Sequence, residues 1–295
     1  MKNKKSGVSL FHLVLRFGYR ALLASIPKNR TGDKMYSFIV FVLIHKRLPT
    51  KKMLFADVLY RIKVTDNIID PLRVFTTDKE FVKLYVKSTV GDNFNVKTIK
   101  VLYNYDDVLK YDYPLDCCIK PTHSCGQVIL RKDGDVIDFS EIEKWFSINH
   151  YLHGRERNYK DLKPKVIVEE RLENVLGENF CDYKIFCHKG KVTLIHVTVD
   201  RYIDRSRIYF NRDWEPQDFT VSIQRYKGKV ERPLNLEKMI EVAEKLSAPF
   251  DFIRVDLYSD GKVCLVGELT HCHGQAGEKI IPLELEQSAS ALFFG

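Results

Sequence analysis

The sequence has no hydrophobic run long enough to cross a membrane and no closely spaced pair of cysteines. Its longest apolar run covers residues 38–44, whereas a membrane-spanning helix needs about 20 apolar residues. The 7 cysteines are odd in number and form no C-x-x-C pair, which argues against a disulfide framework. We therefore expect a globular protein in the reducing cytoplasm.

Internal repeats, low-complexity tracts and a long tail of one charge sign are also missing. There are 47 Lys and Arg residues against 39 Asp and Glu, a formal net charge of +8, and both signs occur throughout the chain. A surplus of this size suits an anionic partner such as a nucleotide, an acidic sugar or a membrane surface. The 45% hydrophobic content is enough to fill the core of one large domain or of two lobes.

Residues 9–26 carry apolar side chains at helical spacing beside Arg16 and Arg20. The polar interruptions and the lack of a small-residue cleavage site argue against a signal peptide. The pattern is typical of a helix packed on the main body. Peripheral contact of this helix with the inner face of the cell membrane is the alternative.

The hydrophobic pattern predicts an α+β architecture. Residues 1–75 are expected to form a helical region with a break near 66–71, and further helices are expected at 77–86, 139–152 and 236–246. Short strands are predicted at 100–102, 117–120, 128–131, 166–168, 184–187, 192–199, 252–258 and 263–269.

Two acidic residues interrupt the last two of these strands, which a tight turn at 259–261 would join. Asp256 and Glu268 can present their carboxylates to a common point, and Arg254 shares a face with Asp256 because side chains alternate along a strand. Two carboxylates and a guanidinium suit magnesium with a triphosphate. A solvated hairpin is the alternative, although unpaired charges in apolar strands are costly.

Two further clusters fit nucleotide binding. Lys120 ends a strand and is followed by a small polar loop closing at Gly126, whose backbone amides can fold over phosphates. Glu169 and Glu170 end another strand and Asp182 follows; such carboxylates can accept hydrogen bonds from ribose. An ordinary hairpin lysine and a charged strand end are the alternatives.

Taken in order, these clusters resemble the TupA-like branch of the ATP-grasp superfamily, which is associated with teichuronopeptide and capsular polysaccharide biosynthesis. The resemblance covers about residues 47–282. The residues that carry it are Thr77-Asp78-Lys79, Ile119-Lys120-x-x-His123-x-x-Gly126, His153-Gly-Arg-Glu156 with Tyr159, Lys163-Pro-Lys-Val-Ile-Val-Glu-Glu170, Asp182-Tyr-Lys184, Arg254-Val-Asp256 and Gly267-Glu-Leu-Thr270. It implies an ATP-grasp domain at 76–295, in which a lid lobe (about 112–168) and a metal-binding lobe (about 169–290) clamp the nucleotide.

The resemblance also implies roles for individual residues. Asp256 and Glu268 would bind Mg²⁺, and Arg254 and Lys120 would be catalytic. The residues that would bind ATP are Lys79, Lys120, His123, Ser124, Gly126, Glu169, Glu170, Leu172, Asp182 and Lys184. The sequence departs from the family at Ser124 and Cys125, where glycine and serine are usual. Thr270 departs from the wider superfamily, which commonly has asparagine there, although this branch often has threonine.

The implied reaction transfers the γ-phosphoryl group of ATP to a carboxylate, and an amine then attacks the acyl phosphate. The substrates would be an amino acid and a uronic acid of a surface polysaccharide or its precursor, nucleotide-linked or polymeric. A sugar kinase of the same fold and a noncatalytic nucleotide-binding scaffold are the alternatives.

The acceptor substrate is expected to contact Arg155, Arg201, Arg207, Thr270, His271, Gly274 and Gly277. The alternatives are a solvated helix end for Arg155 and a solvated face for Arg201 and Arg207. Arginines beside aromatic residues also suit nucleic acid, but no nucleic-acid-binding module is recognisable and none is expected as a partner. The triplet 271–273 contains two histidines around Cys272, which suggests zinc. Alternation along a strand would place Cys272 on the opposite face, so we favour an acceptor pocket there.

Overall fold

The computed structural model describes residues 23–177, 179–199 and 206–295, and the chain divides into two compact units, 1–49 and 50–295. The first unit holds α2 (Arg30–His45), which begins where the Asn29 side chain accepts a hydrogen bond from the amide of Gly32. Only residues 23–26 of the predicted amphipathic helix are described. Within the described ranges, no helix has both the length and the apolar character needed to span a bilayer.

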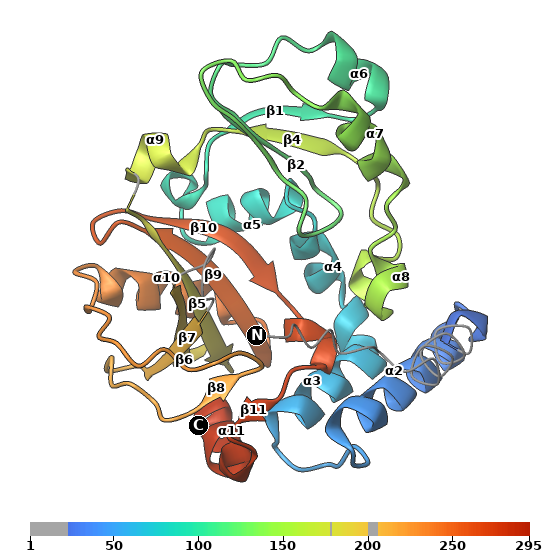
Figure 1. Ribbon diagram of the computed structural model, residues 1–295, viewed down its shortest axis with the longest axis vertical. Helices are drawn as coiled ribbons and strands as arrows, with labels where there is room; N and C mark the ends of the chain where they lie inside the picture. Colours follow the sequence, from blue (N-terminus) through green and yellow to red (C-terminus); the bar gives the residue numbers. More distant parts are fainter. Residues whose placement is uncertain (1–22, 178, 200–205) are drawn as a thin grey trace, which may run out of the picture. The chain divides into compact units, whose positions relative to one another are not determined.

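The larger sheet of the second unit has five antiparallel strands in the order β10-β9-β5-β6-β7 (Figure 1). They are β5 (Cys181–His188), β6 (Lys191–Val199), β7 (Ser206–Asn211), β9 (Phe252–Ser259) and β10 (Cys264–Thr270). Apolar side chains from one face form a core with α10 (Leu236–Ser247). Because strand side chains alternate, polar residues between them point to the opposite face.

The smaller sheet has the order β1-β4-β2-β3 and its own core. Its strands are β1 (Thr98–Leu102), β2 (Cys117–Pro121), β3 (Ile129–Arg131) and β4 (Val166–Glu169). Trp145 and Ile142 of α7 (Phe139–Ser147) are buried in this core, and α6 (Tyr105–Lys110) lies beside α7 (Figure 1). The second unit therefore has two α+β lobes.

Shorter elements connect and flank these lobes. The helices are α3 (Phe55–Val64), α4 (Pro71–Thr77), α5 (Phe81–Thr89), α8 (Tyr151–Gly154), α9 (Leu172–Leu176) and α11 (Glu286–Phe294). The 3-10 turns are η1 (Asp66–Ile69), η2 (Asp92–Phe94), η3 (Arg157–Tyr159), η4 (His273–Ala276) and η5 (Leu283–Leu285). A two-stranded sheet pairs β8 (Thr220–Val221) with β11 (Ile280–Ile281).

The α+β prediction is confirmed, and each predicted strand is present with ends shifted by a few residues. Two helix predictions were wrong. A helix does not open at Thr77: α4 ends there, and the Asp78 side chain accepts hydrogen bonds from the amide of Glu80 and the hydroxyl of Thr122. The predicted helix 139–152 is interrupted at Ile148, whose backbone is extended. The predicted domain limit near residue 75 stays a prediction.

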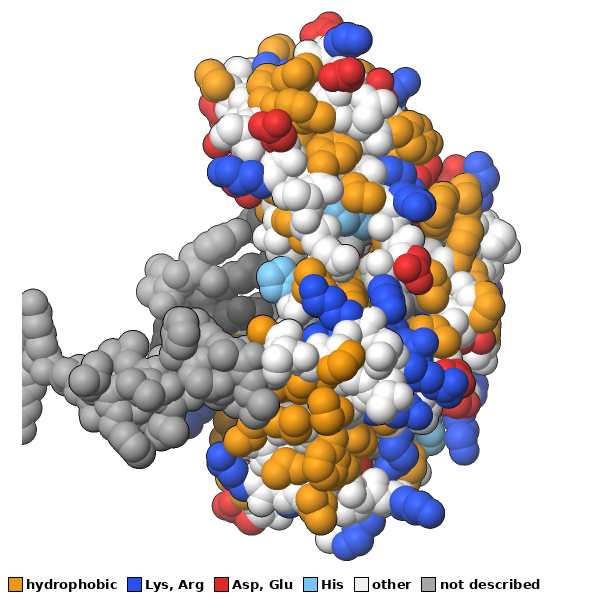
Figure 2. Space-filling model, turned by 90° about the vertical axis from the view of Figure 1, so that its right-hand side faces the viewer, with side chains coloured by type: hydrophobic (Ala, Val, Ile, Leu, Met, Phe, Trp, Pro, Cys, Tyr) orange, Lys and Arg blue, Asp and Glu red, His pale blue; other side chains and the backbone are white. Residues whose placement is uncertain are grey.

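Basic side chains gather on one face of the protein. Figure 2 shows Lys and Arg side chains in groups about midway along this face, with fewer Asp and Glu among them. The arrangement agrees with the net charge of +8, and it suits an anionic partner.

Candidate active site

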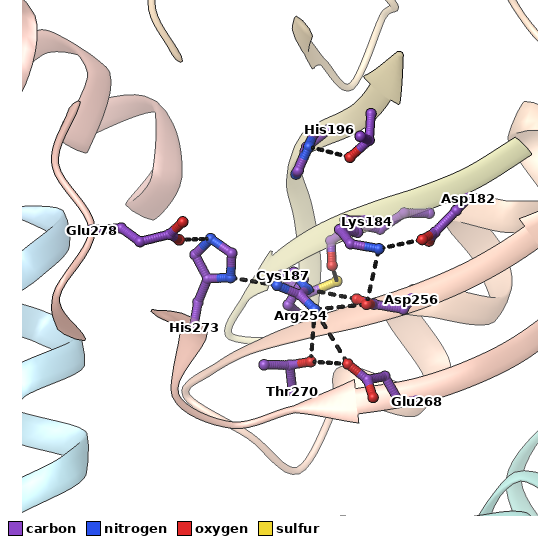
Figure 3. A network of polar contacts seen from close by, with 12 residues as sticks. Asp182, Lys184, Cys187, His196, Arg254, Asp256, Glu268, Thr270, His273 and Glu278 are labelled. Atoms are coloured by element: carbon purple, nitrogen blue, oxygen red, sulfur yellow. Dashed lines mark hydrogen bonds and ion pairs between the residues drawn. The ribbon is translucent and has the colours of Figure 1, made fainter. Parts of the chain in front are cut away.

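One row of side chains crosses all five strands of the larger sheet. The ladder pairs Glu268 with Asp256, Asp256 with Lys184, Lys184 with His196 and His196 with Tyr209. Each strand thus contributes one polar group to the same face, opposite the core formed with α10. Figure 3 shows Glu268, Asp256, Lys184 and His196 of this row with their contacts.

Arg254 connects the row to its neighbours. Its Nε and Nη2 each donate a hydrogen bond of 2.6 Å to the carboxylate of Asp256. The same Nη2 lies 2.9 Å from Thr270 Oγ1 and 3.3 Å from Glu268 Oε1 (Figure 3). Oxygen atoms of three residues therefore converge on one cationic nitrogen.

Lys184 adds a second positive charge to this network. Its Nζ lies 2.6 Å from Asp182 and 3.4 Å from Asp256. Burial alone would raise the pKa of Asp256, but Arg254 and Lys184 more than offset that effect and hold the pKa below its ordinary value. The carboxylate therefore stays ionised at neutral pH.

Glu169 at the end of β4 binds two lysines, Lys83 of α5 and Lys120 of β2. Its carboxylate lies 2.6 Å from Lys83 Nζ and 2.5 Å from Lys120 Nζ, and it is almost completely buried. Burial alone would raise the pKa of Glu169, but Lys120 and Lys83 hold it below its ordinary value. One carboxylate against two ammonium groups leaves a local positive excess, which suits phosphate oxygens.

The loop after β2 lies beside these lysines. Lys79 Nζ donates to the carbonyl of Ser124, and the backbone amide of Lys79 donates to Thr122 at 3.1 Å. Gly126 has φ of +92°, a conformation that side chains other than glycine rarely adopt. Lys79 therefore anchors the start of the loop, and Gly126 allows the backbone to turn at its end.

The segment around α8 lies beside the loop that follows β2. His150 Nε2 lies 3.5 Å from the sulfur of Cys125 in the loop and 4.0 Å from Glu156 Oε2. The ring of Tyr159 packs against the His150 ring at 4.4 Å between centroids. His150, Glu156 and Cys125 therefore lie together on one side of the loop.

The side chains of the triplet 271–273, for which zinc was the alternative to an acceptor pocket, contact different partners. His271 contacts Arg73 and Thr76, whereas Cys272 points its sulfur at a backbone carbonyl of α3. His273 contacts Arg254 through Nδ1 and Glu278 through Nε2. Within the described residues no group of three or more potential metal-ligating side chains is found.

A family model described as TupA-like ATPgrasp matches residues 60–293. The chain belongs to this family. Its α+β fold is the ATP-grasp fold. A search of curated proteins found no match.

Solved structures of ligases are distantly similar to this TupA-like chain. An L-amino acid ligase from Bacillus licheniformis is 12% identical, with a TM-score of 0.42, covering 83% of this chain and 56% of its own. A D-alanine–D-alanine ligase from Bacillus anthracis is 14% identical, with a TM-score of 0.40 and coverages of 74% and 63%. One from Helicobacter pylori is 17% identical, with a TM-score of 0.35 and coverages of 69% and 56%. This chain therefore spans less than two thirds of each of them.

The side chains of this TupA-like protein fit a magnesium nucleotide. Asp256, Glu268 and Thr270 offer the hard oxygen atoms that Mg²⁺ prefers. Arg254 Nη2 donates a hydrogen bond to one oxygen of each of these residues. A bound ion would therefore share their oxygens with the guanidinium. Lys79, with the pair on Glu169, offers ammonium groups for phosphates.

Several residues predicted to bind ATP have other contacts. His123 is buried and donates to the carbonyl of Trp145 at 3.1 Å, inside the smaller lobe. Leu172 packs on a small apolar cluster, and Asp182 contacts Lys184. The Glu170 amide donates to Lys97 O at 3.0 Å. Their roles toward ATP stay predictions.

The predicted acceptor residues are spread over several elements. Arg207 donates to Glu278 at 3.0 Å and Arg155 donates to the Tyr151 hydroxyl at 3.3 Å, both from buried positions. Gly274 lies in η4 with φ of +53°, and Gly277 ends it. Arg201 lies outside the described residues.

Sequence reasoning missed Lys83, His196 and His150. Lys83 lies in α5, whereas Lys79 precedes that helix, so their spacing of four residues is no signal of a shared face. His196 lies inside an apolar strand, and a buried polar residue there was a usable signal. His150 had no local signal, because it reaches Cys125 only through the fold.

Proposed function

We propose that this chain is an ATP-dependent ligase that joins a carboxylate to an amine through an acyl phosphate. The observation that carries the proposal is the convergence of Asp256, Glu268 and Thr270 on Arg254, with Lys79 close enough for its charge to interact with that of Glu268. A magnesium ion and a guanidinium close together would stabilise the negative charge of a carboxylate that receives a phosphoryl group. No side chain is required as a covalent nucleophile.

The chain's own residues would act mainly by charge and position. Lys79 and Lys120 would hold phosphate oxygens, while the loop closing at Gly126 would exclude water. Arg254 would orient the carboxylate substrate and stabilise charge on the transferred group, since its fork is fixed by Asp256. Magnesium, when bound by Asp256 and Glu268, would offset charge on the phosphates.

We propose an amino acid and a uronic acid of a surface polysaccharide or its precursor as the substrates. Support comes from the family and from the basic character of the chain, including Arg207 beside η4. The uronate carboxylate would be the group that is phosphorylated, and the reaction would take place in the cytoplasm.

Calorimetric titration of ATP, with and without magnesium, tests the site. We expect the native protein to bind ATP with magnesium, and D256N/E268Q to lose at least about tenfold in the magnesium-dependent affinity. The matched control is D218N/E237Q, which makes the same substitutions at exposed positions. A folded native protein that ignores ATP would overturn the proposal.

Release of ADP tests the reaction. Incubation with UDP-glucuronate and a mixture of amino acids should yield ADP and an amide product by mass spectrometry. ADP that forms equally well without any amine, together with a phosphorylated sugar, would instead identify a kinase.

Membrane contact is proposed separately, through the stretch 9–26, and rests on its apolar and basic pattern alone. Flotation of the full-length protein with anionic liposomes tests it. A protein that stays at the bottom of the gradient removes the proposal.

A further inference from the structure

Glu156, in the segment that follows α8, is a buried carboxylate that has no role in the proposed mechanism. Only 6% of the residue is exposed. Its Oε2 lies 4.0 Å from His150 Nε2, and His150 in turn lies 3.5 Å from Cys125 of the phosphate loop. The carboxylate therefore lies one side chain away from the loop that would cover the reacting phosphate.

Glu156 also lies near the carboxylate of Glu268. The charges of Lys63 and Glu268 act on the pKa of Glu156. The pKa of the Tyr159 hydroxyl is likewise affected by the charges of Glu156, Glu268 and Arg254. Groups from the loop (Cys125), from η3 and the residue before it (Tyr159 and Glu156) and from β10 (Glu268) thus surround one region. The acyl phosphate would form in this region, between Arg254 and the lysines.

We propose that Glu156 is the catalytic base that accepts the proton from the incoming amine. This role rests on the proposed ligase reaction. An amino acid enters as an ammonium ion, which has no lone pair until it loses a proton. Glu156 is placed to take that proton because it lies near Glu268 and, through His150, beside the loop.

The step is balanced as follows. The ammonium gives one proton to the Glu156 carboxylate, and its nitrogen then bonds to the carbonyl carbon of the acyl phosphate. The bond from that carbon to the phosphate oxygen breaks, and phosphate leaves with the electron pair and the second proton of the nitrogen. Glu156 then returns its proton to water.

The environment of Glu156 supports this role better than that of its neighbours. Burial raises the pKa of Glu156 to about 7, with Glu268 adding to the effect and Lys63 opposing it. Burial lowers the pKa of His150 to about 4, helped by His153 and Lys79. A base works best when its pKa lies near the working pH, which favours the carboxylate over the imidazole.

The test compares E156Q with E143Q, a matched substitution at an exposed glutamate of α7. Both full-length proteins receive ATP, magnesium and UDP-glucuronate, with either mixed amino acids or hydroxylamine as the amine. Hydroxylamine is uncharged at neutral pH, so it attacks without a base. ATP affinity is measured in parallel by calorimetry.

We expect E156Q to lose about 10²-fold or more in amide formation while keeping hydroxamate formation and ATP affinity. In the native protein, amide formation should rise with pH up to about 7 and then level off, whereas in E156Q it should keep rising above pH 7, because the amine must then lose its proton to water. The charged and titratable groups that face Glu156 are Lys63, Glu268, His150, Tyr159, Cys125 and Cys272.

Other outcomes overturn the assignment. Normal amide formation by E156Q, or equal loss of amide and hydroxamate, would show that Glu156 is not the base. A native protein that releases no ADP and forms no hydroxamate would overturn the ligase proposal itself, and the role of Glu156 with it.

Discussion

Glu268 lies opposite Asp256 only because the ladder between β9 and β10 skips Gly267. Val266 pairs with Leu257, and the next pair is Glu268 with Asp256, so the register shifts by one residue. Without that bulge, Glu268 would pair with Val255 and point to the apolar face, because a one-residue shift reverses every side chain. The bulge therefore brings the second carboxylate into the site.

Gly267 should not tolerate a side chain. A Cβ at this position would lie 2.7 Å from the ring of Tyr258, so G267A must displace the ring or the bulge. We expect G267A to lose about 1 to 3 kcal/mol of stability in urea unfolding and to weaken magnesium-dependent ATP binding. The double variant G267A/Y258A should recover part of both losses; if it recovers neither, contact with the ring is not the reason for glycine.

The Arg254–Asp256 pair should contribute to stability as well as to the site. R254M would leave the Asp256 carboxylate with Lys184 as its remaining cation at 3.4 Å, and breaking a buried pair costs about 3 kcal/mol or more. R254K keeps the charge but loses the two-bond fork, so its loss should be smaller. R212M, at a more exposed ion pair, is the control. Equal unfolding free energies for R254M and R212M would contradict this.

Glu169 should make stability depend on pH. Its pKa in the folded protein is lowered by Lys120 and Lys83 despite burial, so its contribution is present above the ordinary glutamate pKa and is lost as pH falls through the folded value. We expect E169Q to be less stable than the native protein near pH 7, and the difference to shrink on acidification. Urea unfolding across pH measures this. E241Q, at an exposed helix position, should leave the midpoint nearly unchanged; a constant difference for E169Q would count against the ion pairs.

Cys125 should be the thiol that reacts first. It is the exposed cysteine of the seven, whereas the others are buried or partly buried, and accessibility limits modification. Ellman's reagent should label one thiol rapidly in the native protein, and C125S should remove that phase. Magnesium-ATP should slow the labelling if the loop closes over phosphates. Rapid labelling of Cys118 or Cys181 instead would show that the loop shields Cys125.

The sequence by itself determined the strands and the residues that each one carries. Alternation along 252–258 placed Arg254 and Asp256 on one face, and the ladder confirms that placement. The α+β class followed from the same local patterns, since periodicity reports which face of each element is buried. The false helix start at Thr77 shows the limit of this reasoning, because Asp78 is bound by Thr122 from a distant segment.

Only the tertiary structure decided which strands are neighbours and therefore which charges meet. The row from Glu268 to Tyr209 exists because β5 lies between β9 and β6, and Glu169 joins Lys83 to Lys120 from three separate elements. The approach of Glu156 and His150 to Cys125 likewise joins segments that share no local pattern. Local patterning fixes the direction of a side chain, whereas its partner depends on strand order and packing between lobes, which arise from contacts distant in sequence.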